Sequence, residues 1–174
     1  MLNWFSRRSA SRRRATDLYG AVVAMAREPR LFRDMGAADS PEGRYEVLVL
    51  QLFLVMERLK SEGEAGSELS RDLVETFVTD MDDNMREMGV GDLTVPRKVK
   101  KAAAAFYDRA EAYRAALAGD AAGAALEEAL RAAIPAAEGR DLDAGRLAEA
   151  VRTRQRALAA QPAEAVFAGN FGPG

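Results

Sequence analysis

Residues 95–117 read VPRKVKKAAAAFYDRAEAYRAAL and carry the most regular hydrophobic periodicity in the chain. Apolar side chains recur there every three or four residues, the spacing that places side chains on one face of an α-helix. The apolar positions are Val95, Val99, Ala102, Phe106, Ala110, Tyr113 and Leu117. The stretch therefore predicts a long amphipathic helix with one face against a core.

A second amphipathic helix is predicted just before this one, from a cap at Ser67 to the glycine at Gly89. Its apolar residues step by about four: Leu69, Leu73, Phe77, Met81, Met85 and Met88. The connection over 89–92 (GVGD) is short, so the two helices should lie antiparallel. We expect a helix hairpin at about residues 67–118.

The rest of the chain also favours helices over strands. Alanine and leucine are abundant and Ile134 is the single isoleucine, a composition that suits helices. The segment after Ser40-Pro41 has a capping residue and a proline in the first turn, and it is apolar nearly all round, which is typical of a central helix. We expect one compact all-α domain of about six helices over 16–169, with a frayed tail at 170–174. The helices are predicted at about residues 17–28, 41–60, 67–88, 95–118, 121–134 and 142–160.

The composition excludes several kinds of site. The chain has no cysteine and no histidine, so disulfides, thiolate metal sites, catalytic cysteines and histidine-dependent triads cannot form. The longest mostly apolar run, Tyr45–Met56, is shorter than the roughly 20 residues that cross a bilayer. We expect no bound metal and no cofactor.

Residues 1–15 are predicted to form a basic flexible arm. The net charge is −2, yet residues 1–14 hold five arginines and no acid. A secretory signal, an organelle transit peptide, a solvated tail, an anchor on anionic lipid and a contact with RNA phosphate on the ribosome all remain open. The residues that would make the last two contacts are Leu2, Trp4, Phe5, Arg7, Arg8, Arg12, Arg13 and Arg14.

The hairpin carries charges that oppose the local helix dipoles. Acidic residues cluster in the last turns of its first helix, and basic residues cluster in the first turns of its second helix. Ion pairs across the hairpin would offset this; alternatively, the charges face a binding partner. The candidate partner-binding residues are Asp80, Asp82, Asp83, Arg86, Glu87, Arg97, Lys98, Lys100, Lys101, Tyr107, Arg109 and Tyr113.

Other polar and methionine residues of the hairpin leave alternatives open. Met81, Met85 and Met88 either fill the core or offer a pliable apolar surface. Asn84 falls within the apolar stripe, so we expect it to have a buried hydrogen-bond partner. The run DMDDN at 80–84 begins like a calcium loop but lacks the glycine and glutamate that an EF-hand needs.

Four stretches together resemble a known family. They are LYGAVVAMAREPRLF (18–32), DSPEGRYEVLVLQLFLVMERL (39–59), DMDDNMREMGVGDLTVPRKVKKAAAAFYDRAEAY (80–113) and LAAQPAEAVFAG (158–169). In this order and spacing they are similar to the ubiquinol–cytochrome c chaperone family, the bacterial relatives of the mitochondrial assembly factor for cytochrome b. The match covers about residues 17–169. The chain departs from the family pattern at Gln51, where histidine is expected, and at Asp108, where glycine is expected.

The resemblance implies a non-enzymatic assembly chaperone without a cofactor. Its client would be newly made cytochrome b, and it would assist assembly of the cytochrome bc1 complex (respiratory complex III). Such a client calls for an exposed apolar patch or groove. We expect a monomer that does not bind DNA and that lies in the cytoplasm, peripheral to the inner face of the cytoplasmic membrane, or at the matrix face in a eukaryote.

Two other classes of protein are alternatives. One is an RNA- or ribosome-associated binding module that uses the arm and the basic turn at 97–101. The other is a magnesium-dependent all-α enzyme of isoprenoid or quinone metabolism that uses Asp80, Asp83 and Glu87. That enzyme would need a second acidic motif, which the sequence lacks.

Overall fold

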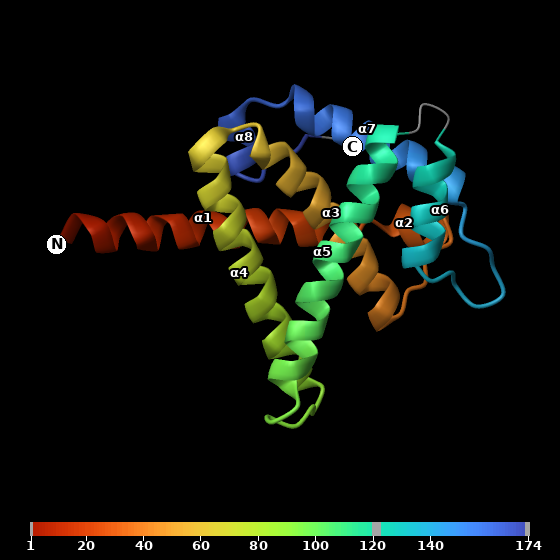
Figure 1. Ribbon diagram of the computed structural model, residues 1–174, viewed down its shortest axis with the longest axis horizontal. Helices are drawn as coiled ribbons and strands as arrows, with labels where there is room; N and C mark the ends of the chain where they lie inside the picture. The colour runs from red at the N-terminus through yellow and green to blue at the C-terminus, as the bar shows by residue number, and fades with distance from the viewer. Residues whose placement is uncertain (1, 120–122, 173–174) are drawn as a thin grey trace.

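The computed structural model describes residues 2–119 and 123–172, with side chains described from residue 11 onward, and these ranges form an all-α fold (Figure 1). The prediction of an all-α domain with about six substantial helices is confirmed. The long helices are α1 (Leu2–Ala26), α3 (Pro41–Lys60), α4 (Gly63–Glu87), α5 (Val95–Gly119), α6 (Ala124–Ala133) and α7 (Ala144–Ala160). Two five-residue helices, α2 (Pro29–Arg33) and α8 (Ala163–Phe167), complete the described chain.

Helix α3 lies at the centre of the fold, as its apolar sequence predicts. It begins where the Ser40 hydroxyl accepts a hydrogen bond from the Gly43 amide at 3.1 Å, with Pro41 in its first turn. It packs against α1, α4, α5 and α7. Its central residues are buried on every side: Val49, Leu50, Gln51, Leu52, Phe53, Leu54 and Val55.

Helices α4 and α5 form the predicted antiparallel hairpin, which projects from the body of the fold with its connecting loop at the far end (Figure 1). Gly89 ends α4 in the left-handed conformation, at φ +77°, which glycine adopts without a steric penalty. The predicted start at Ser67 is wrong. Helix α4 begins at Gly63, and the Ser67 hydroxyl donates a hydrogen bond to the Gly63 carbonyl at 2.9 Å from within the helix.

Four aromatic rings join α1, α3, α4 and α5 at one point. Phe77 of α4 is fully buried. Its ring centroid lies 6.4 Å from that of Tyr19 on α1, 6.3 Å from Tyr45 on α3 and 5.7 Å from Phe106 on α5. Aromatic pairs at such distances stabilise a core beyond the area that they bury. This ring cluster therefore helps to fix the hairpin to the body.

The N-terminal segment differs from the expected flexible arm. Helix α1 starts at Leu2 and continues without a break past residue 16, because this segment holds neither glycine nor proline before Gly20. Ser11 hydrogen-bonds Asp72 of α4, Arg12 lies 3.8 Å from Glu75, and Ala15 is buried. Residues 11–15 therefore pack on α4 as part of the domain.

The C-terminal segment also differs from its prediction. The tail was expected to fray from residue 170, but Phe171 is buried in the core cluster.

The loops before α3 and after α6 meet through an isolated bridge between Ala37 and Ala136. The Ala38 amide donates to the Pro135 carbonyl at 2.8 Å there. Within the described ranges, no helix is both long enough and apolar enough to cross a membrane.

We expect Gly66→Ala to destabilise the fold. A Cβ at Gly66 would lie 1.9 Å from the carbonyl oxygen of Leu59, a backbone atom that cannot move without disturbing the α3–α4 corner. Thermal or denaturant unfolding should show a loss of about 1–3 kcal/mol.

The matched control is Gly119→Ala at the end of α5, where nothing lies within 4 Å of the added atom. This variant should retain the wild-type stability or gain a few tenths of a kcal/mol, about what a helix gains from alanine. Equal unfolding free energies for the two variants would contradict the close approach at Gly66.

Candidate functional site

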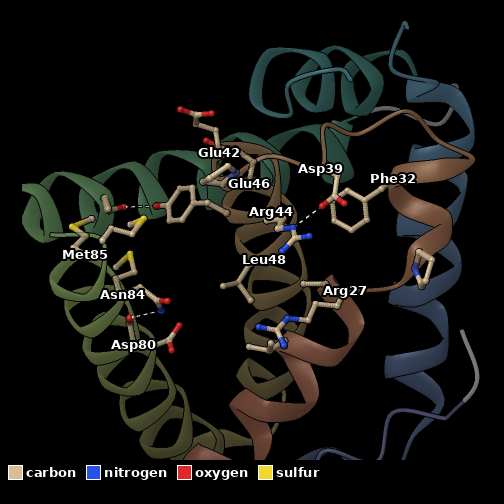
Figure 2. Close-up of a pocket in the computed structure, with 18 of the residues that line it drawn as sticks. Arg27, Phe32, Asp39, Glu42, Arg44, Glu46, Leu48, Asp80, Asn84 and Met85 are labelled. Carbon is tan, nitrogen blue, oxygen red and sulfur yellow. Dashed lines mark hydrogen bonds and ion pairs between the residues drawn. The ribbon is translucent and has the colours of Figure 1, made fainter. Parts of the chain in front are cut away.

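An open groove of about 1020 Å³ lies between the body of the fold and the hairpin (Figure 2). The end of α1 and the short α2 form one side, the first turns of α3 form the floor, and the last turns of α4 form the opposite side. Ala102 of α5 closes the inner end. Its apolar lining consists of Val23, Ala26, Pro29, Phe32, Pro41, Tyr45, Leu48, Met81, Met85, Met88 and Ala102.

Three methionines form the α4 side of the groove. Met81 is 7% exposed, Met85 is half-buried and Met88 is 66% exposed, so exposure increases toward the hairpin tip. The sequence left core filling and a pliable surface open; Met81 fills the core, whereas Met85 and Met88 offer apolar surface. Methionine adapts to differently shaped partners because its side chain is unbranched and polarisable.

Tyr45 forms the inner floor of the groove. Its hydroxyl donates a hydrogen bond to the Ala102 carbonyl at 3.0 Å, and its ring stacks on Phe77. Burial, and then the neighbouring Glu46 carboxylate, raise the pKa of Tyr45 to about 12. The tyrosine thus stays neutral and tethers α3 to α5 beneath the groove.

Asp80 lies at the groove and joins α4 to α1. Its carboxylate accepts a hydrogen bond from the Tyr19 hydroxyl at 2.8 Å. Burial and this hydrogen bond raise the pKa of Tyr19 above its ordinary value. The prediction of a buried Asn84 is wrong, because Asn84 is exposed and its amide donates to the Asp80 backbone carbonyl at 2.7 Å, within its own helix.

Arginines line the side of the groove that faces the methionines. Arg27, which directly follows α1, and Arg44 of α3 lie across the groove from Met85 (Figure 2), and Arg33 of α2 also belongs to the lining. Arg44 forms an ion pair with Asp39 at 2.6 Å. The groove is thus apolar along its length, and the side opposite the methionines carries charged groups of both signs, because Asp39, Glu42 and Glu46 lie there beside the arginines.

The acidic residues of the hairpin lie in two different settings. Asp82 pairs with Arg86 at 2.6 Å, and Arg86 also reaches Asp92 in the connecting loop at 2.6 Å. Asp83 and Glu87 are exposed. The structure brings only Asp80 of the predicted acidic set into the groove.

The predicted ion pairs across the hairpin are absent among the residues whose side chains are described. Arg97, Lys98, Lys100 and Lys101 are all exposed, and none of the ion pairs includes them. The compensation expected for the acidic end of α4 comes instead from Arg86, one turn away in the same helix.

The three remaining candidates on α5 separate by burial. Tyr107 is 57% exposed and contacts Phe106 edge-on. Arg109 forms an ion pair with Glu46 of α3 at 3.2 Å. Tyr113 is fully buried against Phe53, so the prediction that it contacts a partner at the surface is wrong. Burial and the nearby Glu46 carboxylate raise its pKa.

The arm candidates lie on the first half of α1. Arg12, Arg13 and Arg14 are exposed on this helix. Side chains at Leu2, Trp4, Phe5, Arg7 and Arg8 lie outside the described residues, so their contacts stay a prediction.

Sequence reasoning missed most of the groove. Arg27, Phe32, Arg44, Tyr45 and Leu48 come from three elements that meet only in the fold. One signal was available, since both stretches that contain these residues, 18–32 and 39–59, carry the family resemblance. Across the ranges with described side chains, no three acidic, histidine or cysteine residues gather as a possible metal site.

Comparison with known proteins places this architecture in a family. The sequence profile of the ubiquinol–cytochrome C chaperone family matches residues 33–172. A crystal structure of the Cbp3 homolog from Brucella abortus is similar at 35% identity, with a TM-score of 0.80 over 97% of this chain and 93% of that one. A comparison with curated protein sequences returned no match. The chain belongs to the ubiquinol–cytochrome c chaperone family, which confirms the resemblance seen in its sequence.

We expect the stability to fall at high pH because of the buried tyrosines. Tyr45 keeps its proton up to about pH 12 in the fold, whereas the unfolded chain releases it near the ordinary value of 10.0. Its contribution is therefore fully present below pH 10.0 and is lost as the pH rises toward 12. Tyr19 and Tyr113 act in the same direction.

Urea unfolding at several pH values measures this effect. Tyr45→Phe should flatten the fall above pH 10.0, while Tyr107→Phe, a change at an exposed site, should leave the profile unchanged. A profile that Tyr45→Phe does not alter would contradict the raised pKa.

Proposed function

We propose that this protein is a non-enzymatic assembly chaperone that binds newly made cytochrome b and assists assembly of the cytochrome bc1 complex, respiratory complex III. Family membership supports the class of function. The observation that supports a client protein is the groove of about 1020 Å³, which is open to solvent and lined mainly by apolar side chains.

The chemistry of the groove suits a segment of an unassembled membrane protein. Such a segment is apolar and lacks its native packing partners. Burial of its apolar surface against Phe32, Leu48 and the methionines of α4 is therefore favourable. Met85 and Met88 can adjust to side chains of different shape. The arginines Arg27 and Arg44 meet the polar or acidic end of the segment.

The hairpin and the first helix supply further contacts in this proposal. Asp80 contributes to the groove, while Asp82, Asp83, Arg86, Glu87, Tyr107 and Arg109 form the surrounding partner surface. Residues 2–14 of α1 hold the protein at the inner face of the cytoplasmic membrane or beside the ribosome. The protein acts as a monomer without a cofactor.

The proposal is tested by deleting the gene and measuring assembled cytochrome bc1 complex on native gels, together with b-type haem absorbance in membranes. We expect both signals to fall severalfold and to recover when the wild-type gene is restored. Normal levels of assembled complex in the deletion strain would overturn the proposed function.

The role of the groove is tested in the same strain with Met85→Asp and Met88→Asp. Each change places a charge on the apolar side of the groove, where an apolar client would have to desolvate it. We expect little recovery of the complex and weaker co-purification of cytochrome b. The matched control, Ala159→Asp, lies on an exposed position of α7 away from the groove, and it should restore assembly fully.

A further inference from the structure

The hairpin exposes two apolar side chains that the groove does not account for, one at its tip and one at the middle of α5. Leu93 in the connecting loop is 99% exposed and Tyr107 on α5 is 57% exposed. Leu93 and Tyr107 lie outside the groove lining. The exposed leucine at the end of the projecting element gains hydrophobic stabilisation if it enters an apolar environment.

The same region carries a concentrated positive charge. Residues 88–107 contain the cations Arg97, Lys98, Lys100 and Lys101 and a single acid, Asp92, and the exposed acid Asp108 follows Tyr107 on the same side of α5. Asp92 is already paired with Arg86 at 2.6 Å. The four cations are exposed and enter none of the ion pairs among the described side chains. They also sit in the first turns of α5, where the helix dipole disfavours positive charge.

Helical spacing places these groups on one surface. Arg97, Lys100 and Lys101 are separated by three and four residues, which puts them on the same face of α5. Tyr107 follows Lys100 by two turns and lies on that side as well. Leu93 lies just before the helix, in the loop at the end of the projection (Figure 1). The arrangement is an apolar point followed by a cationic face and an aromatic ring.

We propose that this tip surface, defined as Leu93, Arg97, Lys98, Lys100, Lys101 and Tyr107, docks onto an anionic lipid bilayer. Leu93 enters the headgroup region, Tyr107 lies at the interface, and the lysine stems extend so that their ammonium groups meet lipid phosphates. The phosphates supply the negative charge that the first turns of α5 lack. Single-stranded RNA offers the same phosphates, but its bases bind by stacking on aromatic rings and leave the apolar loop residue without a partner.

The acidic residues nearby set the direction of docking. Asp83 and Glu87 are exposed on the last turns of α4, the other arm of the hairpin. An anionic surface repels them, so the loop and the outer face of α5 meet the bilayer while α4 faces away from it. This contact uses no residue of the groove lining, and only Tyr107 is shared with the partner surface proposed above.

The test measures sedimentation of the full-length protein with vesicles of equal parts phosphatidylcholine and phosphatidylglycerol. The tip variant carries Arg97→Gln, Lys98→Gln, Lys100→Gln and Lys101→Gln. Because each of the four basic residues near such a surface contributes about 1 kcal/mol, we expect the partition coefficient to fall on the order of a thousandfold. Pure phosphatidylcholine vesicles should bind the wild-type protein weakly.

A matched control changes the same number of exposed cations elsewhere: Arg71→Gln, Arg131→Gln, Arg140→Gln and Arg156→Gln. This control has the same net charge as the tip variant. Because its tip surface is unchanged, its binding should stay near that of the wild-type protein. Equal losses in the two variants would overturn the proposal, because total charge rather than the tip would then explain binding. The same holds if only glutamine at the five arginines of residues 1–14 removes binding.

A single label follows the loop directly. The chain has no cysteine, so Leu93→Cys carries an environment-sensitive dye at one defined position. We expect the dye emission to shift to the blue with anionic vesicles and to stay unchanged with a single-stranded RNA at equal phosphate concentration. Ala159→Cys on α7 is the labelled control and should not respond. No shift at position 93 with lipid, or a shift with RNA alone, would overturn the proposal.

Discussion

The ring of Phe77 is the point at which α1, α3, α4 and α5 meet. It contacts Tyr19, Tyr45 and Phe106, one ring from each of the other three helices. Two of these partners act again at the groove: the Tyr19 hydroxyl bonds Asp80, and the Tyr45 hydroxyl bonds the Ala102 carbonyl. One buried cluster therefore fixes the hairpin and also sets the distance between the two sides of the groove, which opens directly beyond it.

Sequence periodicity predicted the elements better than their ends or their contacts. The stripes through Phe77 and Phe106 and the apolar α3 identified the hairpin and the central helix, because burial imposes a repeat that a single sequence shows. The start of α4 was misplaced since Ser67 looks like a cap, yet its hydroxyl bonds within the helix. The continuous α1 was missed because a run of arginines resembles a solvated arm although arginine is a good helix former.

The groove shows why a candidate site can be harder to predict than a fold. Arg27 follows α1, Phe32 lies on α2 and Leu48 lies on α3, and no spacing in the sequence joins them. Charge patterns misled in a similar way. The acids and bases of the hairpin suggested pairing across helices, whereas Arg86 holds both Asp82 and Asp92 and leaves the start of α5 without counter-charges. The hairpin thus has two chemically different parts, an apolar methionine surface beside the body and a cationic face near the tip.

The unbroken α1 joins two places that a flexible arm would leave independent. Its first turns lie far from the body, while Val23 and Arg27 near its other end line the groove. A helix of this length extends roughly 35 Å. Any surface or particle that grips the first turns therefore also sets the orientation in which the groove is presented. As one continuous helix, the segment relates the two places by a defined length and direction.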